Sequence, residues 1–435
     1  MNAPQSRTRT RLLVTLATTV VALLVVEVGF RVRAYKRNAE VLDVAFQRST
    51  NPEPGAPADL IDIIRPSPHQ RIVYELKANL DRAYFKRHPV STNSMGFRSK
   101  EYPAEKSANT VVVFGLGDSL MFGHGVPDGQ DCMAHLDEEL NRRFPEKEWR
   151  VYNSGVPGYN TVMEVATLRA KGLPLEPDVV VLNIVGNDLV LPQYMRSEED
   201  VFDLGKSFFV DYIRDSFGRD EGPVFDAWAK AAGAELARRA RAVRFQNGEL
   251  LVEVEPATDL LELKSFVEHY RQLANEALGR DSIQRIVFKL PQVGGLAHKT
   301  EWRTDYENDL DAIPEEYRGM SGMEAFENAL DELRALSAEH GFTVIAFNNV
   351  NLAINPTLLA KAAERGFHTF TVHQDLVDYI EKETGAPFSV ESYTSSKLVV
   401  NRTNLHPSVL HHRIAAHRLV EEMIAIGLVQ ELIDE

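Results

Sequence analysis

Cysteine is almost absent from this sequence, because Cys132 is the only one in 435 residues. A single cysteine cannot form a disulfide within the chain, and it excludes a cysteine-rich zinc site. Positive charge is also scarce, since 48 lysines and arginines stand against 63 aspartates and glutamates and the formal net charge is -15. Binding of nucleic acid needs a basic face for the phosphates. The charge balance therefore argues against a nucleic-acid partner.

Two glycine motifs of common enzyme folds are missing as well. A dinucleotide-binding loop would need a third glycine after Gly115 and Gly117, and that position is Leu120. The nucleophile elbow G-x-S-x-G does not occur anywhere in the chain. The sequence thus predicts neither of these two sites.

One long apolar run lies near the N-terminus, at residues 12–30, and Glu27 is its only charged residue. The run approaches the ~20 residues that a membrane-spanning helix needs. No small-residue cleavage site follows it, which favours an uncleaved anchor over a signal peptide that is removed. The alternative is a long signal sequence. Basic residues lie on both sides of the run, so the positive-inside rule does not decide the orientation.

The rest of the chain is organised around residues 110–125, TVVVFGLGDSLMFGHG. The uncharged run at 111–114 predicts a fully buried strand of a parallel sheet. Gly115 and Gly117 then allow a sharp turn, and Ser119 follows at the carboxyl end of the strand. Open α/β sheets bind their ligands at this edge. Ser119 is therefore a candidate nucleophile, and the alternative is a serine that caps a helix.

Further strands and helices alternate on both sides of a central interruption. Strands are predicted at 149–153, 179–185, 342–347 and 369–372, and helices include one that starts with a capping box of Ser321 and Glu324 and a final one that ends near residue 428. This alternation indicates a doubly wound parallel sheet, an α/β/α sandwich. Right-handed crossovers bring the strand ends to one side of it.

The alternation breaks from about residue 191 to residue 320. Within this stretch we expect a helix at 226–242, a hairpin turn at 246–249, a helix at 260–278 and a strand at 285–290. We interpret the stretch as an insertion beside the active-site edge, where such additions often shape access of the substrate.

Four short segments, in order, resemble sequence blocks of the GDSL or SGNH hydrolase family. The segments are GDSL at 117–120, NSGVPG at 153–158, VGND at 185–188 and TNLHP at 403–407. They correspond to blocks I, II, III and V, and they supply Ser119, Gly155, Asn187 and His406. The resemblance implies the flavodoxin-like sandwich of that family. Residues 93–98, NSMGFR, resemble a segment of its membrane-anchored members, and we expect this segment to pack against the domain.

The resemblance also implies roles for these residues. His406 would take the proton from Ser119 and return it to the leaving group, since neutral imidazole titrates in the useful range. The backbone N–H groups of Ser119 and Gly155, with the side-chain amide of Asn187, would form the oxyanion hole. No cofactor is implied. We also expect no metal site, because the histidines of the predicted last helix lack an evident acidic or cysteine partner.

Two positions depart from the family pattern. Val185 stands where block III usually begins with glycine. The aspartate that normally precedes the histidine by three residues is Thr403, and Asn404 is not acidic either. Losing the carboxylate that orients the imidazole is costly in serine proteases. Asn404 or Thr403 as the orienting residue, a Ser-His dyad, an acid from elsewhere and an inactive protein all remain open.

The expected organisation has three parts. Residues 1–37 form an N-terminal tail and transmembrane anchor, and residues 38–105 form a linker and N-terminal extension. Prolines between residues 38 and 70 predict a stiff, extended spacer. Residues 106–435 form the SGNH hydrolase-like domain with the insertion at about 191–320.

Three functions from different classes fit these observations. The first is a membrane-anchored esterase that removes an acyl group, expected to be acetyl, from a carbohydrate or another envelope ester through an acyl-enzyme on Ser119. The second is a polysaccharide O-acyltransferase of the same fold, and the third a non-catalytic binding module, suggested by the missing aspartate. The partners would be an acylated small molecule or polysaccharide and the membrane. The family's usual substrates favour an extracytoplasmic or periplasmic domain on a single-pass anchor.

Overall fold

The protein is described by a computed structural model that includes every residue of the four sequence blocks. By its internal contacts the chain divides into two compact units. The first unit comprises Met1–Gln47 and Arg196–Trp302, and the second comprises Arg48–Met195 and Arg303–Glu435. The described residues are 4–47, 51–69, 71–103, 105–196, 205, 207–217, 240–246, 249–254, 285–289, 296–298, 315–351 and 354–434.

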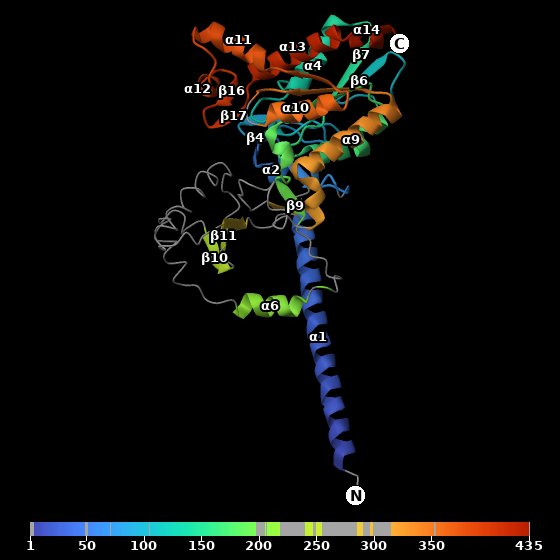
Figure 1. Cartoon of the computed structure of the whole chain (residues 1–435), viewed down its shortest axis with the longest axis vertical. Coiled ribbons are helices and arrows are strands. Elements are labelled where there is room, and N and C mark those ends of the chain that lie inside the picture. The colour runs from blue at the N-terminus through green and yellow to red at the C-terminus, as the bar shows by residue number, and fades with distance from the viewer. Residues whose placement is uncertain are drawn as a thin grey trace. The chain divides into compact units, whose positions relative to one another are not determined.

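The first unit begins with one long helix, α1 (Pro4–Gln47), which Figure 1 shows as a continuous rod. Its segment Arg11–Arg33 has 23 residues with a hydropathy of 2.3, and none of its apolar window is buried. By length and composition this helix is apolar enough to be a membrane span or a signal sequence.

Glu27, the only charged residue of the apolar run, is hydrogen-bonded to a second helix of this unit, α6 (Phe208–Phe217). Its carboxylate accepts bonds from the backbone N–H groups of Phe208 at 3.1 Å and Phe209 at 3.0 Å. It also accepts a bond from Nε of Arg31 at 2.8 Å. These bonds compensate a negative charge at a helix N-terminus, where the helix dipole favours it.

A three-stranded sheet of the first unit lies within the predicted insertion. It contains β10 (Ala240–Gln246), β11 (Glu249–Val254) and β12 (Arg285–Lys289), in the order β10-β11-β12. Gln246 pairs with Glu249 across an antiparallel ladder, which confirms the hairpin, and β12 confirms the predicted strand. The helix predicted at 226–242 is wrong at its end, since pairing with β11 draws residues from 240 onward into a strand. Its remainder and the helix predicted at 260–278 lie outside the described residues.

The second unit is built on a five-stranded parallel sheet, which confirms the predicted fold class. Its strand order is β15-β14-β8-β6-β7, and every neighbouring pair is parallel. In chain order this is the 2-1-3-4-5 arrangement of the flavodoxin-like fold. Each residue of β6 and of β8 is buried, as expected for uncharged runs covered on both faces. The strands are β6 (Thr110–Leu116), β7 (Glu148–Asn153), β8 (Val179–Asn183), β14 (Thr343–Asn348) and β15 (His368–Thr371).

Helices cover both faces of this sheet (Figure 1). One face packs against α4 (Cys132–Arg143), α11 (His373–Thr384) and α13 (Val409–Ala425), whose buried apolar side chains form one core with the sheet. The crossovers between β7, β8, β14 and β15 place α5 (Thr161–Thr167), α9 (Gly322–His340) and α10 (Asn355–Glu364) on the other. The final helix extends less far than expected, and α14 (Leu428–Asp434) follows it.

The stretch predicted as a stiff, extended spacer, from residue 38 to about 70, is helical up to Gln47 and is folded from residue 57 onward, so that prediction is wrong in both parts. Ile63 and Ile64 within it are buried. Pro57 begins β1 and Pro66 ends β2, positions where a missing N–H is tolerated. The elements of residues 57–90 are β1 (Pro57–Ala58), α2 (Leu60–Ile63), β2 (Ile64–Pro66), β3 (Tyr74–Leu76), β4 (Ala83–Phe85) and β5 (His88–Val90).

The predicted capping box at the start of α9 does not form. Ser321 is the N-cap, but its hydroxyl has no hydrogen-bond partner among the described residues. Gly322 follows with a φ of +84°, which departs from the helical geometry that a capping box requires. The remaining elements are α3 (Ser119–Phe122), η1 (Leu168–Gly172), η2 (Leu173–Leu175), η3 (Gly186–Leu189), β9 (Tyr194–Arg196), β13 (Leu296–His298), η5 (Glu315–Met320), α12 (Val390–Thr394), β16 (Val399–Asn401) and β17 (Asn404–Pro407).

Candidate active site

The candidate site lies at the switch point of the parallel sheet, between β6 and β8. The chain leaves β6 toward β7 on one side and leaves β8 toward β14 on the other, so the strand ends open a gap at this edge. Ser119 follows the end of β6 and Asn187 follows the end of β8. The topology therefore brings two of the four predicted residues to one place.

The turn after β6 presents Ser119 at the first position of α3. Asp118 is the N-cap, and its Oδ1 accepts the backbone N–H of Leu120 at 2.8 Å. The alternative that Ser119 caps the helix is thus wrong, because Asp118 is the capping residue. As the first residue of a helix, Ser119 has a backbone N–H without an intrahelical acceptor. That N–H has no hydrogen-bond partner among the described residues.

The segment at 93–98 packs against this turn, as expected, and holds it through hydrogen bonds of Arg98. Arg98 is buried, and its guanidinium donates to the carbonyl oxygens of Phe122 at 2.8 Å, Gly123 at 2.7 Å and Val126 at 2.7 Å. One rigid donor group therefore holds three carbonyls of the loop that follows the nucleophile.

The candidate base lies on a hairpin formed by β16 and β17. Nε2 of His406 is 2.9 Å from Oγ of Ser119, although the two residues are 287 positions apart. Nδ1 of His406 is 2.6 Å from Oδ1 of Asn404, and the backbone N–H of His406 donates to the same oxygen at 3.3 Å. An amide oxygen only accepts, so Nδ1 carries the proton and Nε2 is left to accept one. This is the tautomer that a general base for Ser119 requires.

Thr403, the residue at the family's aspartate position, does not reach the imidazole. Its hydroxyl donates to Oδ1 of Asn401 at 2.8 Å, and its backbone N–H donates to the same oxygen at 2.9 Å. Thr403 therefore shapes the hairpin turn. Of the two candidate orienting residues, the structure brings only Asn404 to His406.

The protonation state of His406 follows from its surroundings. Burial lowers the pKa of His406, the carboxylate of Asp118 raises it, and Lys86 lowers it, with a net result below the ordinary value for histidine. A lowered pKa keeps the imidazole neutral at neutral pH. A neutral imidazole is able to accept a proton from a serine hydroxyl.

The three predicted oxyanion donors are not equally free. Gly155 donates its backbone N–H to Oδ1 of Asn153 at 3.0 Å. Asn187 donates one hydrogen of Nδ2 to Oδ2 of Asp118 at 2.6 Å, which leaves the second hydrogen of that amide. Within the described chain, Ser119 thus offers a free backbone donor, Asn187 offers one remaining hydrogen, and Gly155 would have to exchange its present acceptor.

Close packing of two backbone segments requires glycine at position 155. A Cβ atom there would lie 2.5 Å from the backbone N of Phe122 and 2.9 Å from the carbonyl carbon of Met121. Backbone atoms cannot yield at that distance. Gly155 therefore lets the loop after β7 pack directly against the helix that carries Ser119.

Two residues beside the site were missed by sequence reasoning. Asp118 holds Asn187 and also lies 3.2 Å from Oγ of Ser119. The ring of His124 stacks on that of His406, with centroids 4.2 Å apart and an angle of 13° between the planes. Both residues lie in the stretch around Ser119, so their closeness along the chain was the available signal. Their partners, Asn187 and His406, are distant in sequence, so the sequence held no signal that these contacts form.

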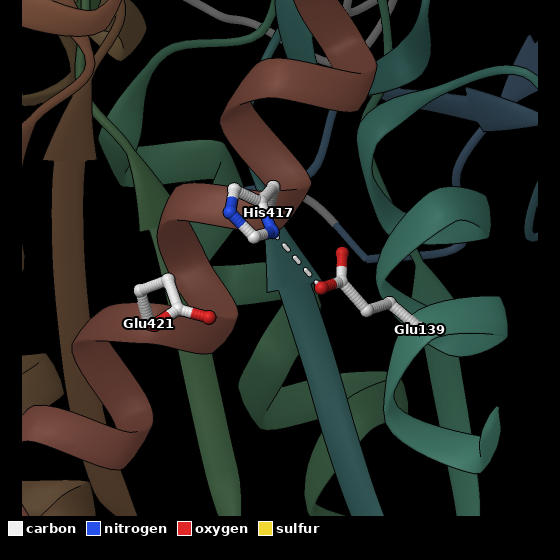
Figure 2. Close-up of side chains that lie close together, drawn as sticks. All are labelled: Glu139, His417 and Glu421. Carbon is white, nitrogen blue, oxygen red and sulfur yellow. Dashed lines mark hydrogen bonds and ion pairs between the residues drawn. The ribbon is translucent and has the colours of Figure 1, made fainter. Parts of the chain in front are cut away.

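The histidines of α13 divide into two kinds. His411 and His412 are buried. His417 is exposed, and its Nδ1 lies 3.0 Å from Oε1 of Glu139, so the expectation that it lacks an acidic partner is wrong (Figure 2).

With Glu421, this pair forms a cluster whose candidate ligand atoms lie within 4.8 Å of one another. Arg143 already bonds both carboxylates, Glu139 at 3.1 Å and Glu421 at 2.6 Å. An arginine supplies the positive charge that the pair of carboxylates attracts. The cluster is therefore accounted for as an ion-pair network on the outer surface of α4 and α13.

Comparison with known proteins gives one family and several distant structures. The model of the GDSL-like lipase/acylhydrolase family matches residues 116–413. No curated protein matches the chain. Among solved structures, the chain is similar to LAE5, an alpha/beta hydrolase enzyme from the metagenome of Lake Arreo, Spain, at 14% identity and a TM-score of 0.35, over 73% of this chain and 96% of that one.

Two further structures are similar at the same level. Axe2, an acetylxylan esterase from Geobacillus stearothermophilus, is 12% identical with a TM-score of 0.32, over 73% of this chain and 96% of that one. A GDSL-like lipase from Parabacteroides merdae is 10% identical with a TM-score of 0.33, over 75% of this chain and 100% of that one. The family match covers more than half of the chain, including all four sequence blocks in part or whole. The chain belongs to the GDSL-like lipase/acylhydrolase family, and its class of activity is ester hydrolysis.

Proposed function

We propose that this protein is a serine esterase in which Ser119 is the nucleophile, His406 the general base and Asn404 the residue that orients the base. The observation that carries the proposal is the continuous relay of 2.6 Å from Asn404 to His406 and 2.9 Å from His406 to Ser119. A nucleophile, a histidine base and a residue that orients the base perform nucleophilic catalysis on unrelated folds, and in papain-like proteases, whose nucleophile is cysteine, the third member is asparagine.

The proposed reaction has two halves. In the first, Nε2 of His406 takes the hydroxyl proton of Ser119 while Oγ bonds to the acyl carbon of the ester, and the carbonyl oxygen becomes an oxyanion. The oxyanion accepts bonds from the backbone N–H of Ser119 and from Nδ2 of Asn187. The carbon–oxygen ester bond then breaks, and the departing alcohol takes the proton from His406.

In the second half, water replaces the alcohol. His406 takes a proton from the water as its oxygen attacks the acyl-enzyme, and the proton returns to Oγ of Ser119 as the acid leaves. We propose that the acyl group is acetyl and that its carrier is a carbohydrate or another envelope ester. This part of the proposal is supported by membership of the family and by the apolar α1 helix, which would hold the site near an envelope surface.

We further propose that α1 is an uncleaved single-pass anchor and that the second unit is extracytoplasmic. The support is the length and hydropathy of Arg11–Arg33 together with the hydrogen-bonded state of Glu27, which removes the main obstacle to burying that segment in lipid. Extraction of membranes at alkaline pH tests the anchor, and protease treatment of intact cells tests the side. Release of the full-length chain by alkali would contradict the anchor.

Reaction of the full chain with a fluorophosphonate probe and with an activated acetyl ester tests the chemistry. We expect stoichiometric labelling and turnover in the unmodified protein, and loss of both in Ser119→Ala and in His406→Ala. His417→Ala is the matched control, because its imidazole lies outside the site, on α13, where it pairs with Glu139. Turnover that persists in Ser119→Ala would refute the proposal. An acetyl burst without turnover would instead point to transfer onto a sugar hydroxyl.

A further inference from the structure

His124 occupies a turn that contacts both halves of the candidate site. Its backbone N–H donates to the carbonyl oxygen of Ser119 at 3.1 Å, so it is tied to the nucleophile's helix. The flanking Gly123 and Gly125 have φ values of +80° and +93°, which side-chain-bearing residues rarely adopt. A Cβ atom on Gly125 would lie 2.8 Å from Nδ2 of Asn404. The turn therefore packs directly against the hairpin that carries the base.

The side chain of His124 contacts two other rings. It stacks on His406 with a centroid distance of 4.2 Å and an interplanar angle of 13°. Phe85 also contacts this ring, in an edge-to-face arrangement with centroids 5.1 Å apart and an angle of 75° between the planes. Phe85 is itself buried in the N-terminal extension. These two ring contacts restrict the orientation of the His124 ring, whose flat face lies nearly parallel to the imidazole of the candidate base.

No hydrogen bond of Nδ1 accounts for the presence of a histidine at position 124. Its Nδ1 atom is buried and has no partner within the described part of the chain. The charged or titratable groups that face the ring are His406, Lys86 and Arg98, and burial together with these groups lowers its pKa well below the ordinary value. His124 therefore stays uncharged at neutral pH and presents an aromatic face to His406.

An uncharged ring face is useful beside this particular base. When His406 accepts the proton of Ser119 it becomes a cation, and its Nδ1 partner, Asn404, is an amide without a full charge. A cation stacked over an aromatic face is attracted by the ring's quadrupole, more strongly where water is excluded. The charged groups that face His406 are Asp118 and Lys86, of opposite sign.

We propose that His124 is a positioning residue that fixes the ring plane of His406 and stabilises its protonated form. The inference rests on the proposed function, because it assigns a role relative to the base of that reaction. It adds a neutral aromatic contact on the face of the imidazole, whose Nδ1 partner is an amide and not the carboxylate of the family pattern.

Three substitutions of His124 test the inference in the full-length protein. His124→Leu and His124→Gln remove the ring, whereas His124→Phe keeps a flat aromatic face. We expect the first two to lower kcat about 3- to 30-fold, the range that cation–π contacts supply. KM should change less than about 2-fold, since the ring acts on the base and not on bound ester. His124→Phe should stay within about 3-fold of the unmodified kcat.

A pH profile separates this role from a purely structural one. Loss of the ring face removes stabilisation of the cation, so the acid limb of kcat should move to lower pH in His124→Leu and stay in place in His124→Phe. His373→Leu is the matched control, because that ring packs edge-on against Phe388 at 5.0 Å outside the site. It should leave both kcat and the limb unchanged.

The outcomes are distinct. Equal kcat in His124→Leu, His124→Gln and the unmodified protein overturns the inference, and so does a fall in His124→Phe as large as in His124→Leu. In both cases the unmodified protein still reacts with the fluorophosphonate probe, so the proposed function survives. An unmodified protein that is folded but neither labelled nor active overturns the proposed function and the inference together. If His124→Leu fails to fold, the comparison of His124→Gln with His124→Phe decides.

Discussion

Replacing Asn404 with aspartate should strengthen the base. The side chain of Asn404 accepts two hydrogen bonds through Oδ1, and its Nδ2 donates none within the described residues. An aspartate therefore keeps both bonds, loses none, and adds a full negative charge beside Nδ1 of His406. Gly125 lies next to Nδ2, and because it carries no side chain it leaves room for the second carboxylate oxygen.

The size of the effect follows from the geometry. Two unit charges about 4 Å apart attract by ~4 kcal/mol at an effective dielectric constant of about 20, which is an upper limit for this half-buried pair. We therefore expect the carboxylate to raise the pKa of His406 by about 1–2 units, which corresponds to ~1.4–2.7 kcal/mol of added stabilisation of the imidazolium. Because the folded-state pKa of His406 rises, the base becomes protonated at higher pH. The acid limb of kcat should move upward by the same 1–2 units, and the plateau above it should rise about 10-fold.

The assay is turnover of an activated acetyl ester across the pH range of histidine titration, for Asn404→Asp and for a matched control, Thr403→Asp. The control restores the acid at the family's position, but Thr403 is exposed and its side chain bonds Asn401, away from the imidazole. It should shift the limb clearly less than Asn404→Asp does. A limb that stays in place in Asn404→Asp, or that shifts equally in both variants, would refute the assignment of Asn404 as the orienting residue.

Three further outcomes are expected. Asn187→Ala should lower kcat about 100-fold with little change in KM, because it removes an oxyanion donor; an unchanged kcat would exclude that role. Glu27→Ala should speed hydrogen exchange at the amides of Phe208 and Phe209 about 10-fold or more, because hydrogen bonds to a charged group stabilise by ~1.5–3 kcal/mol each. Unaltered exchange at these amides would contradict their contact with Glu27. Burial lowers the pKa of His411 to about 4. The unfolded chain binds this proton first as pH falls below about 6.5, so the stabilisation is complete above that pH and is lost toward pH 4, by about 2 kcal/mol between pH 7 and pH 5. His411→Gln should flatten this part of the urea-unfolding profile, and an equally steep profile would count against it.

The features of the fold that were predictable depend on local composition. The buried run at 111–114 and the one at 179–185 contain no charge and many β-branched residues, and both became central strands. Right-handed crossovers bring the carboxyl ends of these strands to one side of the sheet. The same logic placed Ser119 and Asn187 at one edge. Their catalytic roles stay predictions, which the substitutions above test.

The features that were not predictable depend on contacts between distant residues. Prolines at 57 and 66 suggested an exposed spacer, yet Ile63 beside them is buried. The capping signature at Ser321 failed because of the backbone of its neighbour. Asn404 could be distinguished from Thr403 only once the hairpin of β16 and β17 was known, since the two residues are adjacent and neither is acidic. Residue type alone does not carry that information.

In the mechanism we propose, the position of the remaining carboxylate accounts for catalysis without the family's aspartate. Asp118 lies on the nucleophile's side of the imidazole, where it bonds Asn187 at 2.6 Å and raises the pKa of His406 against the larger effect of burial. A charge there favours the protonated base, as the aspartate of the family pattern would, but it also lies 3.2 Å from Oγ of Ser119 and opposes a negative charge on that atom. A neutral amide on the other side of the ring then fixes the tautomer without adding a second negative charge. Orientation and charge, which one aspartate supplies together elsewhere, are thus divided in this chain between Asn404 and Asp118.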